Sequence, residues 1–130
     1  MTSLAAFDRP TKRTLTILGG RVQVIKNPSK EQLDQLQSIL SGEPYSGIVD
    51  IYGVEVSHYL AIEDAGSLVG VASICILGTE CAELHKLYVI PSYRARGIGT
   101  KLFEETLRFL SERKLNELLI EMEDNSQPFW

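Results

Sequence analysis

One stretch, from Ala82 to Leu102, constrains the fold of this chain most. It begins as an apolar run with branched and aromatic residues, which is typical of a buried strand. Pro91 ends that run, and a basic turn containing Gly97 and Gly99 follows. An amphipathic helix then begins near Gly97, because the apolar residues recur at spacings of three and four: Ile98, Leu102, Phe103, Leu107, Phe109 and Leu110. We therefore expect a strand that turns directly into a helix.

The glycines in this turn favour an anion site. The first N–H groups of a helix have no partner within the helix, and the helix dipole adds partial positive charge at the same point. Gly97 and Gly99 allow an anion to approach the backbone where a Cβ would obstruct it. Arg94 and Arg96 add positive charge. These features together predict a phosphate-binding turn.

The order of residues in the turn excludes two common phosphate motifs. A dinucleotide fingerprint needs a third glycine where Leu102 stands, and a P-loop needs Gly-Lys-Ser/Thr where the chain has Gly99-Thr100-Lys101. The pattern Arg94-x-x-Gly97-x-Gly99 instead resembles the Q/R-x-x-G-x-G/A signature of the GNAT-type N-acetyltransferase superfamily. Leu87-Tyr88-Val89-x-Pro91 is similar to the strand that precedes the loop in that family. The alternative, a plain strand–helix turn without a ligand, leaves both arginines unexplained.

The resemblance implies a fold and a co-substrate. The implied fold class is α/β (α+β), a mixed and mostly antiparallel sheet flanked by helices, in which a splayed parallel pair of strands forms the groove for acetyl-CoA. In this chain the groove would lie between Leu87–Val89 and Leu118–Met122, with the pyrophosphate on the N–H groups of residues 96–100. The implied CoA-binding residues are Leu87, Tyr88, Val89, Arg94, Ala95, Arg96, Gly97, Ile98, Gly99, Thr100 and Asn125.

The N-terminal part reads as a leader followed by a hairpin and a helix. Residues 1–13 are expected to be a loose leader and residues 14–130 the acetyltransferase-like domain. Thr14–Leu18 and Arg21–Lys26 are strand candidates joined by Gly19-Gly20, a dipeptide suited to a hairpin turn. Asn27-Pro28-Ser29 then starts a helix, because Ser29 and Gln32 have capping-box spacing, and Gly42 ends it.

The central and C-terminal parts predict a meander and a crossover. His58–Glu63, Leu68–Leu77 and Glu80–Ile90 read as three antiparallel strands. The helix Ile98–Arg113 follows, and Glu117–Met122 is expected to lie parallel to Glu80–Ile90. Residues 43–57 read either as a solvated irregular connection or, by the resemblance, as part of the acceptor wall, with Tyr45, Asp50, Tyr52 and Glu55 as candidate contacts.

The resemblance points to Glu83 as a catalytic base, since some family members carry a glutamate on this strand. The alternative for Glu83 is a solvated carboxylate at the strand end, and His85 is a second, weaker candidate. A strict alternation would place Glu83, His85, Leu87 and Val89 on one face. Asn125 resembles the family's asparagine near the pantetheine. Trp130 stands roughly where the family often has a tyrosine acid, and tryptophan cannot supply that proton.

Composition limits the cellular setting. The net charge of −4 argues against a general nucleic-acid surface. No apolar run reaches the ~20 residues needed to cross a bilayer, and no signal-peptide pattern is present, so a cytoplasmic location without membrane attachment is expected. Cys75 and Cys81 fall in expected strands, where buried thiols are a better interpretation than a metal site.

These observations support two functions. The first is an N-acetyltransferase that moves the acetyl group of acetyl-CoA to a primary amine of a small molecule or peptide, by direct transfer in a ternary complex. The alternative is a catalytically silent acyl-CoA-binding or interaction module. Compared with the family pattern, the C-terminal helix and last strands of the domain are expected to be missing, and a homodimer that covers the open sheet edge is one possible consequence.

Overall fold

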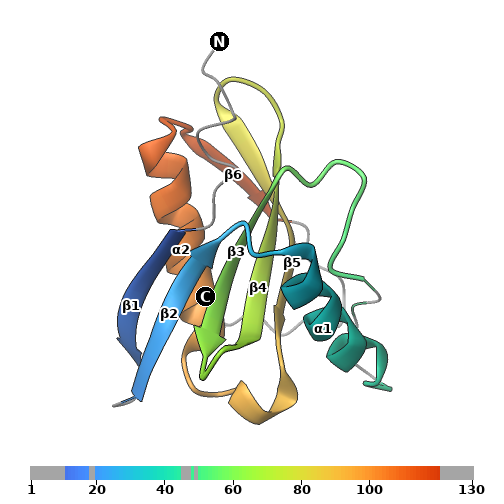
Figure 1. The fold of residues 1–130 in the computed structure, drawn as a ribbon. Coiled ribbons are helices and arrows are strands. Elements are labelled where there is room, and N and C mark those ends of the chain that lie inside the picture. Colours follow the sequence, from blue (N-terminus) through green and yellow to red (C-terminus); the bar gives the residue numbers. More distant parts are fainter. Residues whose placement is uncertain (1–10, 18–19, 45–47, 49, 121–130) are drawn as a thin grey trace.

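One mixed sheet forms the centre of the molecule. The computed structural model describes residues 11–17, 20–44, 48 and 50–120. Six strands follow one another across the sheet in chain order: β1 (Thr11–Ile17), β2 (Gly20–Lys26), β3 (His58–Asp64), β4 (Ser67–Ile76), β5 (Cys81–Val89) and β6 (Glu117–Ile120) (Figure 1). Neighbouring strands are antiparallel except β5 and β6, which are parallel. The expected mixed, mostly antiparallel sheet is confirmed.

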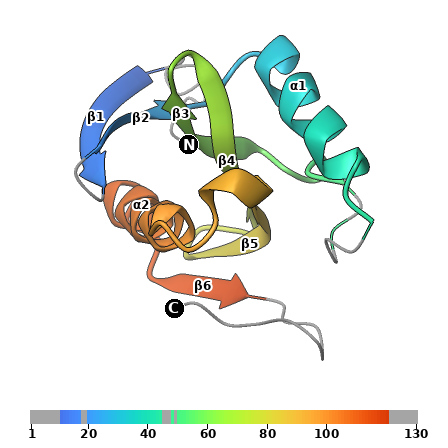
Figure 2. The ribbon, with the colours of Figure 1, turned by 90° about the horizontal axis from the view of Figure 1, so that it is seen from below.

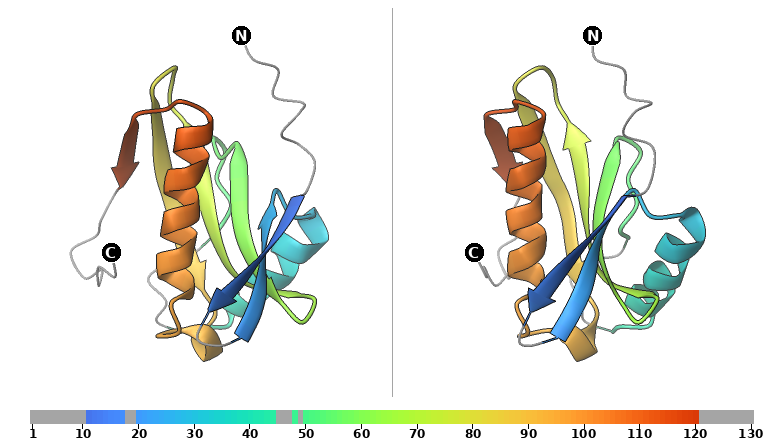
Figure 3. Two further views of the ribbon diagram at one scale, coloured as in Figure 1. Left: turned by 90° about the vertical axis from the view of Figure 1, so that its left-hand side faces the viewer. Right: turned by 60° about the vertical axis from the view of Figure 1, so that its left-hand side comes forward.

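Two α-helices in the described part of the chain cover opposite faces of this sheet (Figures 2 and 3). Helix α1 (Lys30–Ser41) packs on one face over a core that includes Ile25, Leu36, Ala61, Val71 and Tyr88. Helix α2 (Ile98–Glu112) packs on the other face over a core that includes Ile62, Ala72, Leu84, Leu102 and Phe109. Because both faces are covered, most residues of β3 and β4 are buried. Strand β4 therefore reads as a nearly continuous apolar run, whereas β3 is apolar at its centre and carries the buried polar residues His58 and Glu63 near its ends.

Most element boundaries agree with the expectations within one or two residues. The first strand, β1, begins at Thr11, which lies inside the segment expected to be a leader. The last strand, β6, is described as far as Ile120, so the end of the predicted Glu117–Met122 strand lies outside the described residues. Neither helix among the described residues is long and apolar enough to span a membrane.

Helix α1 begins with the predicted capping box. The Ser29 hydroxyl accepts a hydrogen bond from the Gln32 main-chain N–H at 3.1 Å. In return, the Gln32 side-chain oxygen accepts one from the Ser29 N–H at 3.0 Å. Gly42 ends the helix, and its N–H donates to the Ile39 carbonyl. Both ends predicted from the sequence are confirmed.

Removing the cap will measurably destabilise the protein. We expect Ser29→Ala to lower the free energy of unfolding by about 1 kcal/mol, because the Gln32 N–H at the helix start loses its acceptor, the Ser29 hydroxyl. Urea denaturation followed by circular dichroism measures the change. The control is Ser38→Ala, at an exposed position later in α1, which should shift stability by less than about 0.5 kcal/mol. Equal stabilities of the two variants would contradict a stabilising cap.

Candidate functional site

The turn between β5 and α2 leaves main-chain donors without a side-chain cap. Strand β5 ends at Val89, a short 3₁₀ turn spans Pro91–Tyr93, and α2 begins at Ile98. The residue before the helix, Gly97, has φ 85° and makes no side-chain capping hydrogen bond. The first turn of α2 contains no acidic residue. Its N–H groups and the positive end of the helix dipole are therefore available to an anion.

Tight packing against the sheet fixes the start of α2. Ile98 and Leu102 are buried against β4 at Gly70. A Cβ added to Gly70 would lie 3.0 Å from Leu102 Cδ1 and 3.1 Å from Ile98 Cγ2, so glycine permits this close approach. The donors at the helix start are thus held in place before any ligand arrives, which lowers the ordering cost of binding.

The Arg94 side chain forms hydrogen bonds with two other residues of the chain. Its Nε donates to the Val89 carbonyl at 3.0 Å, and its Nη2 donates to the Glu43 carboxylate at 2.9 Å. The Tyr88 hydroxyl donates to the same carboxylate, and burial followed by this partner raises the pKa of Tyr88. Arg94 therefore connects the turn to the chain just after α1. A direct contact of Arg94 with pyrophosphate stays a prediction.

Arg96 lies in a different setting from Arg94. Its guanidinium is 5.0 Å from the centre of the Tyr93 ring, and the side chain is exposed. Tyr93 is itself anchored, because its hydroxyl donates to Asp64 at 2.5 Å. Between the two arginines, Ala95 has φ 62°, a left-handed conformation that costs about 1–2 kcal/mol for a residue with a Cβ. The backbone of the turn is therefore strained at Ala95, beside the anion site.

Among the described residues, no strand pairs with the outer edge of the C-terminal half of β5. Strand β6 pairs only with Cys81–Leu84. Beyond that pairing, the Ile90 N–H donates to Val69 on the β4 side at 3.0 Å. The main-chain N–H and C=O groups of successive residues point to alternate edges of a strand. Those of Tyr88 and Ile90 therefore point toward β4, and those of Leu87 and Val89 point to the opposite edge, away from β4. The bond from Arg94 to the Val89 carbonyl agrees with this direction.

A bulge in β5 changes which side chains share a face. Ser73 pairs with Lys86 and Ile74 with Leu84, so His85 is an extra residue opposite no single partner. The predicted common face of Glu83, His85, Leu87 and Val89 is therefore wrong in its second half. Leu87 and Val89 pack with the α2 core, while Tyr88 joins the α1 core. The extra residue shifts the two-residue alternation by one.

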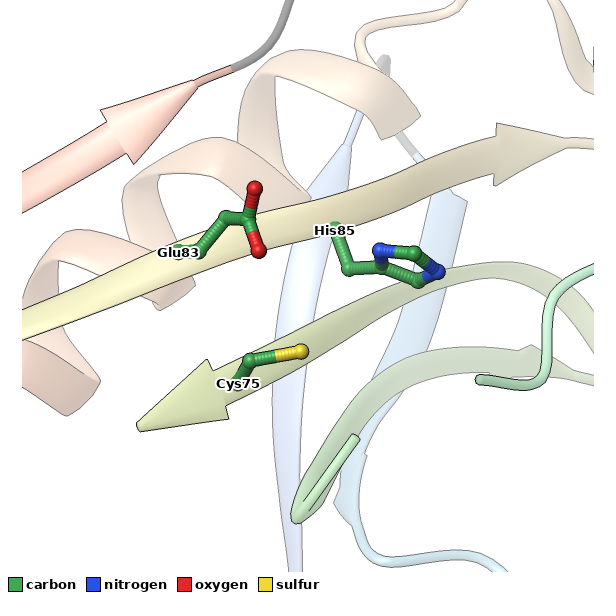
Figure 4. A group of neighbouring side chains, drawn as sticks. All are labelled: Cys75, Glu83 and His85. Atoms are coloured by element: carbon green, nitrogen blue, oxygen red, sulfur yellow. The ribbon is translucent and has the colours of Figure 1, made fainter. Parts of the chain in front are cut away.

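Glu83 and His85 do lie together, and Cys75 lies with them (Figure 4). One ligand-type atom from each of these three side chains lies within 4.8 Å of the other two. Cys75 is on β4 directly opposite Glu83. Cys75 was not predicted as a site residue, because the pairing register of two strands cannot be read from either strand alone.

Cys75 is poorly suited to act as a nucleophile. Burial, followed by the charges of Glu83 and Glu55, raises the pKa of the Cys75 thiol. The thiolate is the reactive form, so the thiol stays largely protonated near neutral pH. The cluster can accept a proton at the Glu83 carboxylate or the His85 imidazole, but it offers no ready covalent route through sulfur.

The candidate acceptor residues fall into three groups. Tyr52 is engaged, because its hydroxyl donates to Asp34 and its main-chain N–H donates to Asp50 at 2.7 Å. Burial and then the Asp34 partner raise the pKa of Tyr52. Glu55 is exposed and close enough to affect Cys75 electrostatically. Asp50 is thus engaged together with Tyr52, and the fourth acceptor candidate, Tyr45, lies outside the described residues, as does the predicted CoA contact Asn125.

Comparisons with known proteins identify the family of this chain. The model of the acetyltransferase (GNAT) family matches residues 30–130. N-alpha-acetyltransferase RimI of Mycobacterium tuberculosis is 41% identical over 56 residues, which span 41% of this chain and 35% of that relative. The match thus spans about a third of the curated relative's length.

Solved structures show the same fold at low sequence identity. A ribosomal-protein-alanine N-acetyltransferase from Brucella melitensis superposes with a TM-score of 0.65 at 16% identity, covering 80% of this chain and 81% of that one. An aminoglycoside N-acetyltransferase in complex with CoA superposes with a TM-score of 0.60 at 15% identity, covering 79% and 81%. Because the family model covers most of the sequence, this chain belongs to the acetyltransferase (GNAT) family.

Proposed function

We propose that this protein transfers the acetyl group of acetyl-CoA to a primary amine of a small molecule or peptide, directly and within a ternary complex. The observation that carries the proposal is the uncapped start of α2 beside the free edge of β5, with Glu83 further back on the same strand. The relatives are named for transfer to protein amino groups and to aminoglycosides, which are all amines. That shared chemistry supports an amine as the acceptor.

The residues present fit a CoA molecule. The N–H groups of residues 96–100 would bind the pyrophosphate, with Arg96 close by. Leu87 would pair its main-chain N–H and C=O groups, and Val89 its N–H, with the amides of the pantetheine arm, because the Val89 carbonyl already accepts a hydrogen bond from Arg94. The absence of acidic residues from the first turn of α2 fits a dianionic ligand. When bound, acetyl-CoA supplies the thioester whose carbonyl the amine attacks.

Glu83 is the proposed base. Its carboxylate is half-buried on the face that also carries His85 and Cys75 (Figure 4). An ammonium ion cannot attack a carbonyl, so a carboxylate that removes a proton, directly or through one water, produces the reactive amine. Glu55 and Glu83 add negative charge near this face, which favours a cationic acceptor. His85 is a second group that can receive the proton.

Direct transfer is preferred to a covalent acetyl-enzyme. The raised pKa of the Cys75 thiol makes this side chain a weak nucleophile. Holding the amine against the thioester already supplies much of the rate enhancement, because the reaction becomes effectively unimolecular.

We also retain a cytoplasmic location and a homodimer as predictions from the sequence.

An acetylation assay tests the function. We expect acetyl-CoA and a pooled library of amines and peptides to give products that are heavier by one acetyl group, detected by mass spectrometry. Products must depend on the protein and on acetyl-CoA. CoA binding without any acetylated product would contradict the enzyme and favour the silent CoA-binding module. Boiled protein serves as the control for uncatalysed acetylation.

A further inference from the structure

We propose that Cys75, Glu83 and His85 bind a Zn²⁺ ion, and that this ion inhibits acetyl transfer. The three side chains come from two neighbouring strands and point to one region on the α1 side of the sheet (Figure 4). They offer one sulfur, one carboxylate oxygen and one ring nitrogen. No ligand residue belongs to the proposed CoA contacts.

The geometry is close to that of a tetrahedral site. The three ligand atoms lie within 4.8 Å of one another. Metal–ligand bonds of about 2.0–2.3 Å at tetrahedral angles place ligand atoms roughly 3.3–3.7 Å apart. The most widely separated pair therefore has to approach by at most about 1.5 Å. Small rotations of the half-buried Glu83 and His85 side chains supply that change, while Cys75 is buried and stays in place.

The ligand types select the metal. A thiolate and an imidazole favour zinc and its spectroscopic substitute cobalt, whereas magnesium and calcium prefer oxygen ligands. Three protein ligands with a fourth position for water are typical of an open zinc site. Binding displaces the Cys75 proton, which passes to solvent as the sulfur–metal bond forms. The exposed Glu55 carboxylate adds negative charge nearby, which favours a cation.

The fold holds the ligands in this arrangement. The antiparallel register places Cys75 opposite Glu83. The bulge at His85 keeps the imidazole on the same side, although the residues after it change faces. The ring packs against Gly53, where an added Cβ would lie 2.8 Å from His85 Nε2. A side chain at position 53 would therefore displace the ring, so glycine keeps the space that the imidazole occupies.

The inhibitory effect rests on the proposed function. A metal ion bound by Glu83 occupies the carboxylate oxygens that would receive the proton of the amine. Metal binding itself does not depend on that function. The two claims can therefore fail separately, because cobalt and zinc binding are measured without acetyl-CoA or any acceptor.

Metal titration provides the first test. We expect the full chain, stripped with a chelator, to bind one Zn²⁺ by calorimetry. Substitution with Co²⁺ should produce a thiolate-to-cobalt charge-transfer band in the near ultraviolet and intense tetrahedral visible bands. Absence of the charge-transfer band in the folded protein would overturn the site.

Variants identify the ligands. The charge-transfer band should disappear in Cys75→Ser. The affinity for zinc should fall by more than about 100-fold in each of Cys75→Ser, Glu83→Gln and His85→Gln, because losing even an outer-shell partner of a ligand lowers metal affinity by about 10–100-fold. The matched control is Cys81→Ser, because Cys81 is the other free thiol and lies outside the cluster. It should bind metal like the unmodified chain. A band that persists in Cys75→Ser, or disappears in Cys81→Ser, would overturn the assignment.

The histidine and glutamate variants keep the test decisive if Cys75→Ser does not fold. Unchanged zinc affinity in both Glu83→Gln and His85→Gln would then refute the site. Where acetyl transfer is measurable, zinc should inhibit it, and a chelator should reverse the inhibition. The zinc inhibition constant of Cys75→Ser should rise by the same factor as its zinc Kd, a comparison that does not depend on the basal rate of the variant. Zinc binding without inhibition would refute the inhibitory role alone.

Discussion

Gly99→Val will weaken CoA binding by about 100-fold or more. Each hydrogen bond to a charged group contributes about 1.5–3 kcal/mol, so losing two such contacts to the pyrophosphate accounts for this factor. The branched side chain would stand where the phosphate oxygens approach the helix start. Position 99 is the second residue of α2, and valine is compatible with a helix there. Calorimetry with CoA measures the effect directly.

A matched control separates this steric effect from a general effect of valine in α2. Ser111→Val places the same side chain at an exposed position near the other end of the helix. We expect its CoA affinity to equal that of the unmodified chain, and circular dichroism should show both variants folded. Unchanged affinity in a folded Gly99→Val protein would end the assignment of the phosphate site.

Glu83→Gln will lower kcat by about 10²–10³-fold, within the range attributed to a positioned base. Glutamine keeps the size and much of the hydrogen bonding of glutamate but cannot take the proton. A higher pH should restore part of the rate, because more of the amine is then neutral without help. Assays should contain a chelator, so that metal bound at the same residues does not alter the comparison. Rates measured across pH with one acceptor test this expectation.

Two further variants sharpen the interpretation of Glu83. Glu31→Gln removes one carboxylate from an exposed position in the first turn of α1 and should leave kcat unchanged. His85→Gln should have little effect unless the two residues share the proton. Full activity of Glu83→Gln at every pH, together with loss of activity in Gly99→Val, would show that the site acts by positioning alone.

Local sequence signals were sufficient for much of the fold. Ser29 and Gln32 predicted the start of α1, since capping depends on residues only three positions apart. The strand, proline and glycine order predicted the turn into α2, and the crossover rule predicted that β6 lies parallel to β5. These features depend on neighbours in the chain or on general handedness, so one sequence contains the information.

Features that depend on contacts between distant segments were not predictable. The bulge at His85 reflects how β5 fits against β4, and it reversed the expected faces of Leu87 and Val89. Arg94 bonds to Glu43, which lies 51 positions earlier in the chain, although the local sequence indicated only a nearby phosphate. The position of Cys75 beside Glu83 likewise depends on strand register.

A nitrogen–proton NMR titration with CoA tests the central claim most directly, because it reports on each main-chain N–H group. We expect the largest shifts at the start of α2, at Ile98, Gly99 and Thr100, and on the free edge of β5, at Leu87 and Val89. Residues of the β1–β2 hairpin should change little. Saturable shifts confined to these two segments would support CoA binding at the proposed site. Shifts centred elsewhere, or none at millimolar CoA, would contradict it.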